Sequence, residues 1–255
     1  MKISIITVVL NAEHTIADAI NSVIYQTHPN IEHILIDGNS TDKSLEIINQ
    51  YRKHLAHVVS EKDDGLYFAM NKGIALASGD VIAFLNADDI YEDSSVLSQV
   101  AMAFEDQTLD ACYADLVYVK QNNLKHIVRH WRSQQHYSGL SFRGWMPAHP
   151  TLFIKREIFN KVGNFNTALK YQSDLEFCTR LFESHSIKSL YIPKLWVRMR
   201  LGGVSNNSLL TMIKGNWESY LALKKLGLKR NPFSYFFIKF SSRLLQFFNV
   251  QRNND

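Results

Sequence analysis

The sequence is poor in cysteine and has no long apolar segment. Only two cysteines occur in 255 residues, Cys112 and Cys178. Neither lies in a Cys-x-x-Cys pair or beside a histidine, so no zinc site and no disulfide framework is expected. No run of about 18 apolar residues exists, so no transmembrane helix is expected. The apolar run Ile3–Leu10 is followed at once by Asn11 and Glu13 without a small-residue cleavage site, so we expect no signal peptide.

The sequence also lacks the glycine-rich loops that bind phosphates in two large enzyme classes. No G-x-G-x-x-G follows the first apolar run, which disfavours a dinucleotide oxidoreductase. No G-x-x-x-x-G-K-[ST] is present, which disfavours a P-loop nucleoside triphosphatase. The net charge of +4 is mild and gives no indication of nucleic-acid binding, and no nucleic-acid partner is expected.

Short apolar runs alternate with amphipathic segments through the first half of the chain. Such alternation is typical of βαβ units, which build an α/β fold with a mostly parallel central sheet and helices on both faces. The predicted strands are Ile3–Val9, Ile34–Asp37, Val58–Ser60 and Val81–Leu85, and the predicted helices lie near 16–24 and over Thr41–Tyr51, Leu66–Ala77 and Val96–Phe104.

The pattern changes after Cys112. Two apolar segments around Asn122-Asn123 indicate a hairpin, and a further strand and two helices follow. The predicted elements here are strands Tyr113–Lys120, His126–Arg132 and Leu152–Lys155 and helices Glu157–Val162 and Asp174–Glu183.

Polar and acidic residues follow the predicted parallel strands. Ligands of open α/β sheets bind outside the carboxyl ends of the strands, so these side chains are the first candidates for a site. Gathered carboxylates repel one another unless a positive charge lies among them, and Mg²⁺ or Mn²⁺ prefers carboxylate oxygens and substrate phosphates. A reaction in which a nucleoside diphosphate leaves fits such a cation. The candidates are Asn11, Asp37, Glu61, Asp63, Asp64, Asn86, Asp88 and Asp89.

A general base is also needed to activate an attacking hydroxyl, and Asp174 is the candidate. It opens a predicted helix, where the helix dipole favours its negative charge. It belongs to the second half of the chain, from which it can face the nucleotide edge across a cleft. Glu176 is two residues further along and points to another face of that helix.

Four segments in this order resemble the family 2 glycosyltransferases, which have the nucleotide-diphospho-sugar transferase (GT-A) fold. Within that family the chain looks most like bacterial transferases that build colanic-acid-type and other surface polysaccharides. The resemblance covers residues 1–205, with a donor-binding half over about 1–110 and an acceptor-side half over about 111–205. The segments read SIITVVLNAEHTI, IDGNSTDKS, SEKDDGLYFAMNKGIALASGDVIAFLNADD and HPTLFIKREIFNKVGNFNTALKYQSDLEFCTRL.

The resemblance implies roles on the donor side. Asn86-Ala87-Asp88 resembles the family's metal-binding D-x-D motif, although the family often has Asp where Asn86 stands. Because a neutral amide binds metals poorly, the metal is expected on Asp88 or Asp89, and the sequence leaves that choice open. The predicted donor-binding residues are Thr7, Val9, Asp37, Asp63, Asn71, Asn86, Ala87 and Asp88.

On the acceptor side, Asp174 matches the family's catalytic base, which implies inversion at the anomeric carbon by one direct displacement. Trp145 and His149 are predicted to contact the acceptor. Structural readings stay open beside these roles. Asp37 and Asp63 also suit turns, Asp88-Asp89 suits a helix cap, and Arg200–Gly203 suits either a lid over the donor or a plain glycine turn.

Residues 206–255 form a predicted helical extension. Residues 206–228 place Leu209, Leu210, Ile213, Trp217, Tyr220 and Leu221 along one side. Beyond them, seven aromatic or leucine side chains between Phe233 and Phe248 share one helical face, with basic and polar residues opposite. Such a helix favours a membrane interface over packing on protein.

The sequence therefore predicts an inverting, metal-dependent glycosyltransferase that uses a nucleotide-sugar donor. The expected acceptor is a glycan or a lipid-linked glycan of bacterial surface polysaccharide synthesis. The expected location is cytoplasmic, peripheral on the inner face of the cell membrane. One alternative is a sugar-nucleotide pyrophosphorylase, but LNAEHT stands where that class has a glycine-rich basic loop. Another is a catalytically silent, membrane-associated subunit that binds sugar nucleotides or glycans.

Overall fold

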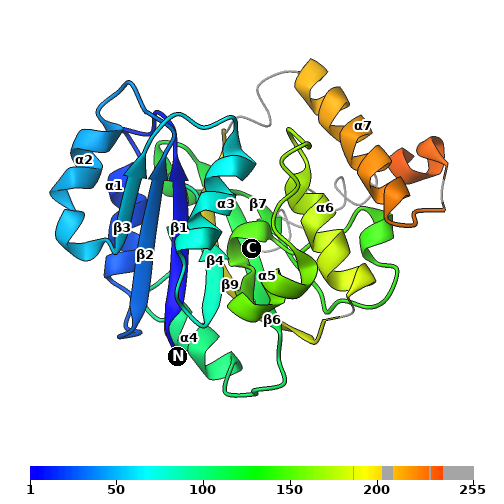
Figure 1. Cartoon of the computed structure of the whole chain (residues 1–255), viewed down its shortest axis with the longest axis horizontal. Helices are drawn as coiled ribbons and strands as arrows, with labels where there is room; N and C mark the ends of the chain where they lie inside the picture. The colour runs from blue at the N-terminus through cyan, green and yellow to red at the C-terminus, as the bar shows by residue number, and fades with distance from the viewer. Residues whose placement is uncertain (186, 203–208, 230, 238–255) are drawn as a thin grey trace.

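One sheet organises the protein, and Figure 1 shows it in a computed structural model of the chain. The model describes residues 1–185, 187–202, 209–229 and 231–237. Over these residues the sheet has nine strands in the order β3-β2-β1-β4-β8-β6-β9-β5, and β7 pairs with β6. The strands are β1 Ile3–Val9, β2 Ile31–Asp37, β3 His57–Ser60, β4 Val81–Phe84, β5 Ile90–Tyr91, β6 Ala111–Lys120, β7 Asn123–Trp131, β8 Phe153–Lys155 and β9 Ser189–Arg200.

The parallel part of the sheet is narrower than the sequence predicts. β3, β2, β1 and β4 are mutually parallel, as predicted. β1 and β4 form from apolar runs that are buried on both faces, whereas the edge strand β3 is only half-buried at Val58 and Val59. Beyond β4 the sheet is mixed, because β8 runs antiparallel to both β4 and β6 whereas β6 and β9 are parallel. In the parallel part Val9 is paired with Asp37 and Asp37 with Ser60, so the carboxyl ends of β1, β2 and β3 are level.

Two strands have no counterpart in the predicted elements. The short β5 and the long β9 pair with each other at the end of the sheet, with Ile90 opposite Arg198. β9 contains Pro193 and many half-exposed positions, so it lacks the continuous apolar run that marks β1. Its partners, rather than its own hydrophobic pattern, determine that it is a strand.

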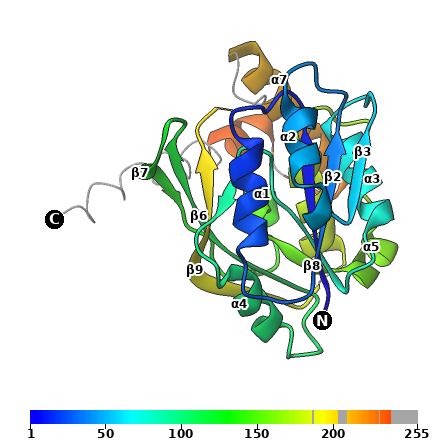
Figure 2. The same ribbon diagram turned by 90° about the vertical axis from the view of Figure 1, so that its left-hand side faces the viewer.

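Helices cover both faces of the sheet, as predicted. In Figure 2, α1 and α2 lie on one side of β2, and α3 and α5 lie on the other. Apolar residues of α3, α5 and α6 form one core against the sheet, and those of α1, α2 and α4 form two others. The helices are α1 Ile16–Ile24, α2 Ser44–Gln50, α3 Leu66–Leu76, α4 Val96–Ala103, α5 Arg156–Val162 and α6 Ser173–Thr179, which a π-helical turn over Arg180–Ser184 continues.

A last helix, α7 (Leu209–Lys225), packs beside α6 (Figure 1). Its buried side carries Tyr220 and Leu223, which cluster with Leu175 of α6. The predicted apolar side is wrong in part, because Trp217 and Leu221 are about half exposed, at 50% and 46%. Residues 232–237 are helical, and the remainder of the predicted aromatic helix lies outside the described residues. Among the residues that the structure describes, none of the helices is long and apolar enough to cross a membrane.

Candidate active site

The carboxyl ends of β1, β2 and β3 meet at Gly38. A Cβ atom at this position would lie 3.6 Å from Leu10 Cδ1 and 3.9 Å from Asp63 Oδ2. Leu10 is 63% exposed, whereas the seven residues of β1 before it are all buried. Leu10 is not among the predicted donor-binding residues, because nothing in the apolar run Ile3–Leu10 indicates that its last residue is exposed. Leu10, Gly38 and Asp63 therefore form one corner of the candidate site.

The two β1 residues predicted to line this corner are both buried. Thr7 is 0% exposed, and its hydroxyl lies 3.0 Å from Nε2 of the buried His33. Val9 is 3% exposed and belongs to the core between the sheet and α1 and α2, while its carbonyl accepts a hydrogen bond from Gly38 N. Thr7 and Val9 thus support the edge from within, and their predicted contact with a donor stays a prediction.

Asp37 organises the turn that follows β2. Its carboxylate is fully buried and accepts hydrogen bonds from Ser40 Oγ at 2.5 Å, Ser40 N at 3.2 Å and Ser60 Oγ at 2.6 Å. These contacts join the ends of β2 and β3. They match the turn reading of Asp37, and its predicted contact with a donor stays a prediction.

The acidic residues after β3 have a cation of their own. Lys72 Nζ of α3 lies 2.5 Å from Glu61 Oε1 and 2.5 Å from Asp63 Oδ1. Hydrogen bonds to these two carboxylates raise the pKa of Lys72. Asp63 Oδ2 is buried without a hydrogen-bond partner among the described residues. The ammonium group of Lys72 therefore reduces the repulsion between the carboxylates of Glu61 and Asp63, and no metal ion is needed to bring them together.

Asn71, one residue before Lys72, contacts backbone. Its Nδ2 donates to Phe165 O at 2.9 Å, and its Oδ1 accepts from Phe165 N at 3.0 Å. Both polar atoms of the amide are thus occupied by the segment that leads to α6. The geometry makes Asn71 a link between α3 and the acceptor-side half, in contrast to its predicted role in donor binding.

The loop after β4 contains the second acidic pair. Asn86 Nδ2 donates to Asp89 Oδ2 at 2.8 Å, and Asp89 N donates to Asn86 O at 3.1 Å. Asp89 is wholly buried, and its Oδ1 has no hydrogen-bond partner in the part of the chain that the structure describes. Ala87 is buried, whereas Asp88 is only partly so. Asp88 is therefore the more accessible carboxylate, with Asp89 behind it.

The pKa values of Asp88 and Asp89, the acidic pair of this loop, are both raised. Burial raises the pKa of Asp88, and Arg200 partly opposes the shift. Burial and the charge of Asp88 together raise the pKa of Asp89 well above its usual value, and the hydrogen bond from Asn86 opposes this. A divalent cation would stabilise both ionised forms. Within the described residues no group of three or more metal-binding side chains exists, so a cation here would depend on two carboxylates and on ligand phosphates, as Mg²⁺ commonly does.

Arg200, the last residue of β9, fastens this loop. Its Nη1 donates to Asp88 O at 2.7 Å, and its Nη2 donates to Asp18 Oδ2 of α1 at 2.5 Å. The side chain is 5% exposed. Because Arg200 is anchored in the sheet, the lid predicted to begin here does not include it, and Gly203 lies outside the described residues.

Asp174 lies at the start of α6 and faces the sheet. Its Oδ1 accepts from Leu175 N at 2.9 Å and from Tyr67 Oη of α3 at 3.3 Å. His149 stacks on Phe84, the last residue of β4, with ring centroids 5.7 Å apart. Burial lowers the pKa of His149, and the charge of Asp174 opposes the shift. The predicted base, His149 and the end of β4 are thus brought into one neighbourhood from three separate segments.

Trp145 lies further from the sheet edge. Its ring packs against Tyr113 and Phe182, with centroid distances of 5.9 and 5.7 Å. The indole Nε1 is buried without a partner among the described residues. Trp145 thus contributes to the core beneath the acceptor-side half, and its contact with an acceptor stays a prediction.

The chain is similar in sequence to bacterial glycosyltransferases. A PGL/p-HBAD biosynthesis glycosyltransferase of Mycobacterium bovis is 29% identical over 208 residues, which cover 80% of this chain and 78% of that protein. TuaG of Bacillus subtilis, named for teichuronic acid biosynthesis, is 37% identical over 106 residues, which cover 40% of this chain and 42% of TuaG.

Solved structures share the fold at low sequence identity. S. aureus TarS 1-349, in complex with UDP-GlcNAc, matches with a TM-score of 0.70 and 18% identity over 100% of this chain and 74% of that chain. The mannosyltransferase PcManGT from Pyrobaculum calidifontis, in complex with GDP-Man and Mn²⁺, matches with a TM-score of 0.65 and 17% identity over 91% and 67%. The fold is therefore GT-A-like. The model of the family described as glycosyl transferase family 2 matches residues 4–171, more than half of the sequence, and the chain therefore belongs to glycosyl transferase family 2.

Proposed function

We propose that the protein is an inverting glycosyltransferase that moves a sugar from a nucleotide-sugar donor to a hydroxyl of a glycan or lipid-linked glycan. The observation that carries this proposal is the convergence of Asp174 and the loop after β4. Tyr67 contacts Asp174, and His149, which feels the charge of Asp174, stacks on Phe84. A carboxylate from the acceptor-side half therefore stands near the acidic loop of the donor-side half.

The donor would bind along the carboxyl edge of β1 to β4. Its base and ribose would occupy the corner formed by Leu10, Gly38 and Asp63, where Asp63 Oδ2 is a buried acceptor without a partner among the described residues. A nucleoside contains hydroxyl and N–H donors that can satisfy such an oxygen. Its diphosphate would then extend toward Asp88. Complexes of TarS with UDP-GlcNAc and of PcManGT with GDP-Man support a donor of this class.

The residues of the β4 loop fit a divalent cation, Mn²⁺ or Mg²⁺. Asp88 offers a partly exposed carboxylate, and Asp89 offers a buried oxygen that has no hydrogen-bond partner among the described residues. When bound, the cation would offset the negative charge of the diphosphate. We assign Asp88 as the main ligand because Asp89 is buried behind it and is held by Asn86.

The base would act on the acceptor. Asp174 would take the proton of the acceptor hydroxyl as its oxygen attacks the anomeric carbon. A new C–O bond forms on one face of the sugar while the C–O bond to the diphosphate breaks on the other. The configuration at that carbon is therefore inverted. Burial favours the neutral form of His149, which therefore adds no positive charge beside Asp174.

Asp174→Asn tests the reaction. The amide retains the size of the side chain but cannot take the proton, so transfer is expected to be lost while donor binding persists. Asp93→Asn is the matched control, because Asp93 also accepts from a backbone N–H near the start of a helix, α4, away from the proposed site. Normal turnover of Asp174→Asn would overturn the assignment of the base. Release of pyrophosphate instead of nucleoside diphosphate by the wild type would favour a pyrophosphorylase.

The acceptor is expected at a membrane surface, in bacterial surface polysaccharide synthesis, on the cytoplasmic face. The name of the Bacillus relative TuaG, which refers to teichuronic acid biosynthesis, supports a role in polymer synthesis. Phe233 and Phe237 are 89% and 75% exposed, next to the exposed Lys224, Lys225 and Lys229. Exposed aromatic rings beside lysines suit an anionic membrane interface.

Peripheral membrane binding is tested by sedimentation with vesicles that contain anionic lipid. Deletion of residues 232–255 is expected to abolish binding, and Phe233→Ser with Phe237→Ser is expected to weaken it. Unchanged binding of both variants would refute membrane contact through this segment. It would leave the transferase assignment intact.

A further inference from the structure

The segment that leads to Asp174 is held in place by side chains from three helices. Asn71 of α3 binds the backbone of Phe165 through two hydrogen bonds. Arg180, at the end of α6, donates to the carbonyls of Val162 and Asn164. Glu218 of α7 binds the last part of the segment. The segment thus has no regular structure of its own and depends on these side chains for its shape.

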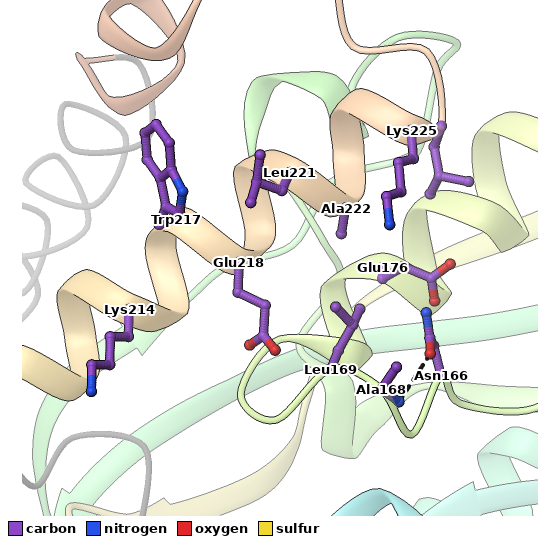
Figure 3. Close-up of a pocket in the computed structure, with 11 residues that line it drawn as sticks. Asn166, Ala168, Leu169, Glu176, Lys214, Trp217, Glu218, Leu221, Ala222 and Lys225 are labelled. Carbon is purple, nitrogen blue, oxygen red and sulfur yellow. Dashed lines mark hydrogen bonds between the residues drawn. The ribbon is translucent and has the colours of Figure 1, made fainter.

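Of these three side chains, Glu218 binds the part of the segment that is nearest to Asp174 in the sequence. Its Oε1 accepts from Lys170 N at 2.5 Å, and its Oε2 accepts from Tyr171 N at 2.8 Å. Both oxygens of one carboxylate therefore bind consecutive backbone N–H groups, and hydrogen bonds to an ionised acceptor are the stronger kind. Figure 3 shows Glu218 pointing from α7 toward the loop that carries Leu169.

Packing alone does not hold the loop against α7 along this stretch. A groove of about 570 Å³ separates them, with Asn166, Ala168 and Leu169 on one wall and Trp217 and Leu221 on the other (Figure 3). Glu218 reaches across where side chains do not interdigitate. Loss of its carboxylate would therefore free the loop rather than be compensated by neighbouring apolar contacts.

Close packing resumes on either side of Glu218. A Cβ at Gly215 would lie 3.3 Å from Tyr171 Cβ, so the backbone of α7 lies very close to the segment here. Leu175, the residue after Asp174, packs in a cluster with Tyr220 and Leu223 of α7. α7 therefore touches the chain on both sides of the base.

We propose that Glu218 is a positioning residue for the transfer reaction, through which α7 sets the place of Asp174. This rests on the proposed function, in which Asp174 is the base. α7 would then be part of the catalytic unit and not only a connection to the C-terminal segment. A displacement of about 1 Å in a reacting group can reduce a rate by roughly 100-fold. Glu218 binds residues 170 and 171, four and three positions before Asp174, so loss of this contact can change the rate strongly.

The test uses the full-length protein and the nucleotide-sugar that best protects it against thermal unfolding. Glu218→Gln removes the charge and one acceptor, and Gly215→Ala pushes on Tyr171 from the same helix. Asp93→Asn is the matched control, because Asp93 likewise accepts from a backbone N–H and a hydroxyl, those of Ser95, but at the start of α4. The measurements are kcat, acceptor KM, donor Kd and amide hydrogen exchange over residues 164–172.

In both α7 variants kcat is expected to fall about 10- to 100-fold with donor Kd unchanged. Exchange at 170 and 171 should rise in Glu218→Gln, while Asp93→Asn behaves as the wild type. Faster exchange with a normal kcat, or a normal kcat in both α7 variants, would overturn the proposal. An inactive wild type would instead refute the proposed function, so the two failures are distinguishable.

Discussion

Two acidic pairs follow β3 and β4, two strands of the parallel part of the sheet that β2 and β1 separate, and the surroundings of the two pairs differ. Glu61 and Asp63 after β3 share the ammonium group of Lys72, which lies 2.5 Å from each. Among the described residues, the cation that acts on Asp88 and Asp89 after β4 is Arg200, whose Nη1 donates to the Asp88 carbonyl. Burial leaves the second pair with raised pKa values. The first pair thus has an ion-pair partner within the fold, whereas the carboxylates of the second pair have none in the part of the chain that the structure describes.

The largest expected effect comes from removing the accessible member of the second pair. We expect Asp88→Ala to reduce transfer by about 10²- to 10³-fold, since a lost charge-stabilising group commonly costs that much. The rise in melting temperature that Mn²⁺ and donor give the wild type should disappear as well. Asp63→Asn, as the counterpart in the first pair, should weaken donor binding but keep the response to Mn²⁺. Equal loss of that response in both variants would break the comparison.

A smaller effect is expected for the second member of this pair, Asp89, whose replacement should increase the stability of the metal-free protein. The folded-state pKa of Asp89 is raised, so ionisation of Asp89 lowers the free energy of unfolding as the pH rises from about 4. Asp89→Asn removes that penalty and should raise the free energy of unfolding at pH 8, with the two curves converging near pH 4. Urea unfolding at both pH values measures this. A variant that is less stable than the wild type at pH 8 would contradict it.

The smallest effect is expected at the first pair. Lys72→Met leaves Glu61 and Asp63 without their cation, so the melting temperature should fall slightly at pH 7 and recover at acidic pH, where the carboxylates protonate. High salt should reduce the difference because Lys72 and Glu61 are partly exposed. An unchanged melting temperature at low salt would mean that the ion pairs contribute nothing to stability.

Much of the fold follows from local patterns. The parallel strands β1 to β4 and the helices between them are predicted in outline, because β1 and β4 bury continuous apolar runs and α1 has a clear apolar stripe. The start of β2 is predicted too late, at Ile34 instead of Ile31, because the polar pair Glu32 and His33 interrupts its apolar pattern. Those two are buried because Lys2, Ser4 and Thr7 on the neighbouring strand supply partners. Such cross-strand pairing is not visible in a single segment.

The candidate site is predictable in outline and not in its contacts. The carboxyl-edge rule selects the loops after β2, β3 and β4, whose strands are parallel and lie in one block with β1 in the sheet. It does not say which side chain beyond β1 is exposed, and the family resemblance implies Thr7 and Val9 and not Leu10, which is 63% exposed. It also cannot find Arg200, which arrives on a strand whose own pattern is irregular. Contacts between segments distant along the chain account for these gaps.

The position of β8 has a consequence for how the protein is made. This strand of only three residues is inserted between β4 and β6, and it is the link between the parallel and the mixed parts of the sheet. During synthesis the outer edge of β4 stays open until residue 155 has left the ribosome, and open strand edges invite pairing with other chains. A fragment ending near residue 110 would carry the corner of Leu10, Gly38 and Asp63 with an uncovered edge at β4. We therefore expect that residues 1–110 do not fold as an independent unit.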